Sequence, residues 1–84
     1  MNRKQQATLR QIMARPVRAN VRWTDFVSLM KALGADVEEG RGSRVRFLFD
    51  RAAATFHRPH PSAFMDNGAV SSAQELLRTL GVAK

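Results

Sequence analysis

The 84-residue sequence contains no cysteine, which excludes a disulfide framework, a cysteine-based zinc site and a thiol nucleophile. It also has no apolar run approaching the ~18 residues of a membrane-spanning helix. The basic N-terminus is not followed by the apolar segment of a secretory signal, so we expect a cytoplasmic protein without a membrane partner. Two histidines without a carboxylate cluster give little support for a metal site, and we expect no cofactor.

Acidic residues are scarce in this chain. Fourteen Lys and Arg face seven Asp and Glu, which gives a net charge of +7. Six cations precede the first acidic residue, Asp25. A second basic cluster, over residues 41–58, has Asp50 as its only acidic residue. Each cluster taken alone is compatible with a solvated face. The excess nevertheless favours a polyanionic partner, with nucleic acid first and an anionic membrane or an acidic protein next.

The pattern of apolar residues and chain breakers predicts one α+β domain with the order α-β-β-β-α and a three-stranded antiparallel sheet, preceded by an extra N-terminal helix. Two helix starts are predicted from capping residues, Thr24 for the second helix and Ser72 with Glu75 for the last. Trp23, at the start of the second helix, is expected in the core. The predicted helices cover 3–14, 24–33 and 72–80, and the predicted strands cover 36–39, 44–49 and 52–57.

The turn at Asp50–Arg51 sets the pairing of the second and third strands. A two-residue loop places Arg44 opposite His57 and keeps the apolar residues of both strands on one face, as register requires. A four-residue loop keeps the same faces but brings His57 opposite Arg46. In either register, basic side chains and a histidine share the face that does not carry the core.

Four short segments in this order carry a resemblance to a known family: Phe26–Leu33 followed by Gly34; Gly42–Ser43; Phe56–Pro61; and Leu76–Leu80 with Gly81–Val82. Together they resemble the HicA family of bacterial toxins, which are small basic proteins with a fold like the double-stranded RNA-binding domain. The resemblance covers roughly residues 21–82. We therefore divide the chain into an N-terminal basic helix and connector, 1–20, and a HicA-like domain, 21–84.

The resemblance implies a ribonuclease that cleaves messenger RNA, inhibits translation and is silenced by a HicB-type antitoxin. We expect a monomer when the antitoxin is absent. In the family, the catalytic residue is a histidine directly after the Gly-Ser. Here Gly42–Ser43 is followed by Arg44. The motif histidine is therefore replaced, and the chain has only His57 and His60 to serve in its place.

Our hypothesis is that His57 replaces the family histidine from the neighbouring strand, because imidazole can act as base or acid near neutral pH. His60 matches the family's His-Pro position and is the second catalytic candidate, although it also suits RNA binding or shaping the loop. His57 equally suits a strand-edge residue that binds phosphate. The RNA-binding candidates are Ser43, Arg44, Arg46 and Arg58, with arginine suited to holding phosphate.

Two other functions are compatible with the sequence. One is a nucleic-acid-binding module of the same fold without catalysis, which would be consistent with the missing motif histidine. The other is an adaptor whose basic surface binds an acidic protein.

Overall fold

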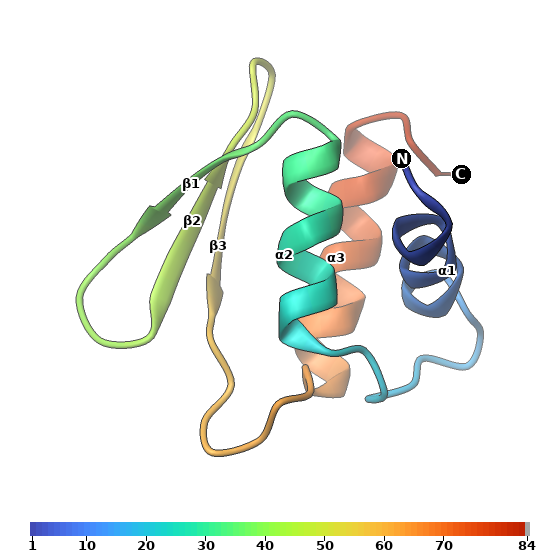
Figure 1. The fold of residues 1–84 in the computed structure, drawn as a ribbon, viewed down its shortest axis with the longest axis horizontal. Helices are drawn as coiled ribbons and strands as arrows, with labels where there is room; N and C mark the ends of the chain where they lie inside the picture. Colours follow the sequence, from blue (N-terminus) through green and yellow to red (C-terminus); the bar gives the residue numbers. More distant parts are fainter. Residues whose placement is uncertain (84) are drawn as a thin grey trace.

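The computed structural model describes residues 1–83 and confirms the predicted order of elements, including the extra N-terminal helix (Figure 1). None of the helices in these residues is both long and apolar enough to cross a membrane. The boundaries of the first helix and of the strands lie within two residues of the prediction. The elements are α1 (Arg3–Ile12), α2 (Trp23–Ala32), β1 (Asp36–Glu39), β2 (Arg44–Leu48), β3 (Ala53–His57) and α3 (Asn67–Thr79).

The three strands form one antiparallel sheet in the order β1-β2-β3. The β2–β3 register follows the two-residue loop, because Arg44 is paired with His57 and the Phe49 N–H donates to the Ala52 carbonyl at 2.8 Å. The four-residue alternative is therefore wrong. Burial alternates along β2, as expected for a sheet with one covered face. Helices α2 and α3 lie on that face, and the other side of the sheet, the outer face, carries no helix of residues 1–83 (Figure 1).

Aromatic rings join α2 to the covered face of the sheet. The rings of Phe26 and Phe56 lie 4.9 Å apart at 62°, and those of Phe26 and Phe47 lie 5.4 Å apart at 79°. Such edge-to-face pairs add to the free energy gained from burial alone. Trp23 is 7% exposed and its ring lies 6.0 Å from that of Phe47, which confirms it as a core residue.

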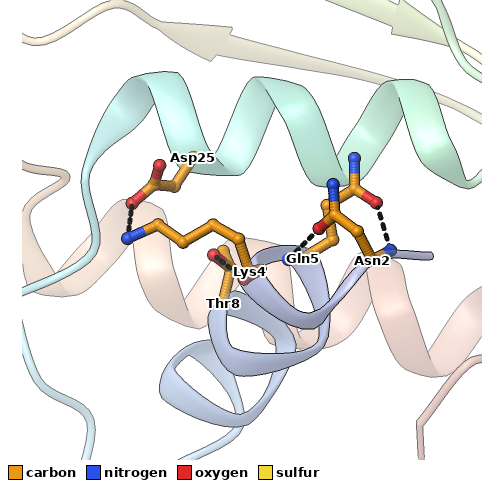
Figure 2. A network of polar contacts seen from close by, with 5 residues as sticks. All are labelled: Asn2, Lys4, Gln5, Thr8 and Asp25. Atoms are coloured by element: carbon orange, nitrogen blue, oxygen red, sulfur yellow. Dashed lines mark hydrogen bonds and ion pairs between the residues drawn. The ribbon is translucent and has the colours of Figure 1, made fainter.

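Helix α1 packs on the side of α2 and α3 that faces away from the sheet (Figure 1). Its first turn is closed by a capping box, in which the Asn2 side chain accepts from the Gln5 N–H and the Gln5 side chain accepts from the Asn2 N–H (Figure 2). The Gln5 amide also donates to the Ser28 hydroxyl at 3.0 Å. Figure 2 shows the second link, in which Lys4 reaches Asp25 of α2 at 3.5 Å. These contacts fix α1 against α2.

The C-terminal end of α1 is buried in the core. Ile12 is fully buried, and Thr8, one turn earlier, is 1% exposed. The buried Gln74 of α3 donates its amide to the Ile12 carbonyl at 2.8 Å and to the Ala14 carbonyl at 3.3 Å. A buried amide without a partner would be costly, so these bonds make α1 part of the same packed unit as α3.

Both predicted capping residues are wrong. Helix α2 begins at Trp23 after Arg22, whose extended backbone is bridged to Phe64, so Thr24 lies inside the first turn. Helix α3 begins at Asn67, because the Asp66 side chain accepts the Ala69 N–H at 2.8 Å. The Ser72–Glu75 pair lies in mid-helix. A capping-box spacing therefore arose by chance within a helix that starts five residues earlier.

The helix start at Asp66 gives a stability prediction. Asp66→Ala removes the cap of α3 and should lower the free energy of unfolding by about 1 kcal/mol. The matched variant Ser72→Ala changes an exposed mid-helix residue and should leave stability unchanged or slightly raised. Urea unfolding followed by circular dichroism measures both. Equal stability of the two variants would contradict the assignment.

Candidate nucleic-acid interface

The outer face of the sheet brings together three of the predicted site residues. Arg44 is paired directly with His57 across β2 and β3, and Arg46 is paired with Thr55 one step along. All four side chains are exposed. They share this face because alternate residues of a strand point to the same side, while Val45 of β2 is buried on the other.

Ser43, directly before β2, forms hydrogen bonds to the end of β3. The Ser43 hydroxyl lies 3.4 Å from Nδ1 of His57, and the Arg58 N–H donates to the Ser43 carbonyl at 2.7 Å. Gly42 precedes it with φ of +65°, a conformation that favours glycine. Within residues 1–83 the other imidazole nitrogen of His57, Nε2, has no hydrogen-bond partner. Ser43 thus orients the ring and leaves Nε2 open.

The electrostatics of the outer face are mixed near β1. Arg46 is also paired with Glu38 of β1, and a hollow of about 300 Å³ is lined by Glu38, Glu39, Arg44 and Arg46 among others. Neither arginine is in an ion pair within the described residues 1–83. Two guanidinium groups are therefore available at the β2–β3 side of the face, and the carboxylates of this hollow come from β1.

Arg58, the third arginine among the RNA-binding candidates, is placed differently. Its guanidinium forms an ion pair with Glu39 of β1. It lies beside a groove of about 550 Å³ between α2 and β1, together with Trp23 and Lys31. Its charge is therefore partly neutralised, and the structure does not bring it together with Arg44 and Arg46.

The two histidines line separate hollows. His57 lines a hollow of about 230 Å³ between β3 and the start of α3, together with Asp66 and Ser72. His60 lies three residues beyond β3 and lines a second hollow of about 390 Å³ with Phe64 and Asp66. The structure records no hydrogen bond between the two imidazoles. Asp66 is the one residue that lines both hollows.

Sequence reasoning missed two features near the site. Glu38 lies opposite Arg46, which the alternation of β1 would have indicated once its register was known. Phe64 is 40% exposed in the loop before α3. Every other phenylalanine lies in a helix, in a strand or directly after one. The position of Phe64 in a loop was therefore the signal in the sequence for an exposed ring.

Comparison with known proteins gives one match. The family model described as HicA toxin of bacterial toxin-antitoxin matches residues 23–82. No curated protein and no solved structure matches the chain. The matched range runs from the first residue of α2 to just beyond α3, and α1 lies outside it.

Proposed function

The chain belongs to the HicA family of toxins, and we propose that it is an endoribonuclease that cleaves messenger RNA and thereby inhibits translation. Membership makes it a toxin of a toxin–antitoxin system, with an antitoxin as its partner. We propose further that this antitoxin is of the HicB type and that cleavage needs no metal or other cofactor. The observation that carries the proposal is His57, which lies directly opposite Arg44, the residue at the family's histidine position.

The chemistry uses groups already on the outer face. In metal-free RNA cleavage, a base takes the proton of a ribose 2′-hydroxyl and the 2′-oxygen attacks the adjacent phosphorus. The P–O5′ bond then breaks, which leaves a 2′,3′-cyclic phosphate, and the 5′-oxygen takes a proton from water. Nε2 of His57 is open to accept the first proton. In this proposal, Arg44 and Arg46, which lie on the same face as His57, hold the phosphate and stabilise the negative charge that develops on it.

Expression and cleavage assays test this function. The proposal expects that induced expression arrests bacterial growth with loss of messenger RNA, that a HicB-type antitoxin restores growth, and that purified protein cleaves RNA in EDTA. The proposal would be contradicted if the protein arrested growth, or bound RNA, while the RNA stayed intact. That outcome would favour a second candidate, a non-catalytic RNA-binding module, which the arginine at position 44 supports.

The two outer-face arginines should control the salt dependence of RNA binding. Replacing both Arg44 and Arg46 with glutamine removes two phosphate contacts. The slope of log affinity against log salt should therefore fall by about 1.4 for single-stranded RNA. Arg51→Gln, at the β2–β3 turn away from His57, is the matched control and should keep the parental slope. Binding titrations at several salt concentrations measure this, and equal slopes for both variants would contradict the placement of phosphate.

A further inference from the structure

Phe64 exposes an aromatic ring from a backbone that is held firmly in place. The segment before α3 runs antiparallel to the residues before α2. The Trp23 N–H donates to the Ala63 carbonyl at 2.9 Å, and the Met65 N–H donates to the Val21 carbonyl at 2.9 Å. Met65 itself is 1% exposed, whereas Phe64 is 40% exposed. The ring is therefore presented to solvent by a fixed scaffold, and its exposure contributes nothing to the core.

The surroundings of this ring have the chemistry of a nucleobase site. The guanidinium carbon of Arg22 lies 5.0 Å from the ring centroid, which is cation–π geometry. The ring lines the 390 Å³ hollow together with His60, Ser62 and Asp66. Small-molecule sites begin at about 300 Å³. Flat aromatic and guanidinium planes are the groups on which unpaired bases stack. The Asp66 carboxylate at the edge of the hollow can accept hydrogen bonds from base amino groups.

The position of this hollow relates it to the proposed cleavage site. Asp66 borders both this hollow and the one lined by His57, and the two histidines are three residues apart in the chain. An RNA strand whose phosphate lies at His57 and Arg44 can thus place a neighbouring base at Phe64. A base in a duplex is stacked on its neighbours and cannot enter such a hollow.

We propose that Phe64, Arg22 and His60 form a subsite that stacks one unpaired nucleobase next to the nucleotide held at His57. The inference rests on the proposed function and deepens it, because it makes single-stranded RNA the substrate class. It also gives His60 a binding role distinct from that of His57.

Phe64→Ala is the first variant to test. It should weaken binding of a short single-stranded RNA by about 5- to 150-fold, the range expected when one stacked base is lost. Because no charge changes, the salt slope should stay at the parental value, unlike that of the Arg44 and Arg46 double variant. Binding of a duplex of the same sequence should be unchanged. Phe64→Leu keeps apolar bulk but removes the aromatic plane, so it should bind nearly as weakly as Phe64→Ala and guards against a folding defect.

A scan of abasic substitutions along the RNA makes the test specific. With the parent protein, one abasic position should reproduce the affinity loss of Phe64→Ala. With Phe64→Ala, the same position should cause no further loss. Parental affinity in both Phe64 variants would overturn the subsite, as would an equal loss on duplex RNA. So would unchanged RNA binding combined with weakened antitoxin binding, which would make Phe64 part of a protein interface. A parent protein that does not bind RNA at all would instead refute the proposed function.

Discussion

Replacing His57 with alanine should lower RNA cleavage by about 10²–10⁴-fold, the usual contribution of a positioned general base. Induced expression of this variant should no longer arrest growth. RNA affinity should change little, because Arg44 and Arg46 still supply the phosphate contacts. Single-turnover cleavage and a binding titration on the same RNA separate the two effects. A His57→Ala chain that cleaves as fast as the parent would remove His57 from the mechanism.

The register of the sheet offers a rescue that a merely structural histidine would not show. Residues 44 and 57 are cross-strand partners on the same face, so a histidine at either place can project over the same region. Arg44→His restores the family histidine. Added to His57→Ala, it should recover part of the lost cleavage, whereas Arg51→His at the far turn should recover none. Equal rates in the two double variants would show that position 44 cannot replace position 57.

The sheet could be predicted from the sequence because period-2 alternation and turn length together allow few registers. The apolar residues of β2 had to face those of β3. With Asp50–Arg51 as the turn, Arg44 then lies opposite His57. A slip by one residue would have moved Val45 and Phe47 to solvent, so burial enforces the register. The shared face of Arg44, Arg46 and His57 could be predicted for that reason, whereas their role in binding or cleavage stays a prediction.

Tertiary contacts determined the features that the sequence did not reveal. Helix α2 begins where the backbone of Arg22 meets Phe64, a contact between residues far apart in the chain. The ion pair of Arg58 with Glu39 depends on the position of β1, and the separation of His60 from His57 depends on the path of the loop. Local spacing carries no information about such contacts, so the sequence named Arg58 and His60 as candidates without indicating where either would lie relative to His57.

Ile12→Ala should lower the free energy of unfolding by about 2–5 kcal/mol, because the site is fully buried and the surrounding helices relax only partly around the cavity. That is a large share of the ~5–15 kcal/mol that stabilises a small domain. Arg10→Ala, on the exposed side of the same helix, is the matched control and should change stability by no more than about 0.5 kcal/mol. Urea unfolding followed by tryptophan fluorescence reports both variants, since Trp23 lies in the core.

The loss of stability in Ile12→Ala tests whether α1 belongs to the same folding unit as the rest of the chain. The matched family range begins at residue 23, yet Gln74 inside that range donates its buried amide to the Ile12 carbonyl. We propose that the division into 1–20 and 21–84 marks the extent of the family pattern and does not separate two folding units. Removing residues 1–20 would then leave that amide without partners and expose apolar surface on α2 and α3, so residues 21–84 alone should lose cooperative unfolding. A truncated chain with parental stability, or an Ile12→Ala loss no larger than that of Arg10→Ala, would show instead that α1 is an appendage to an independently folded domain.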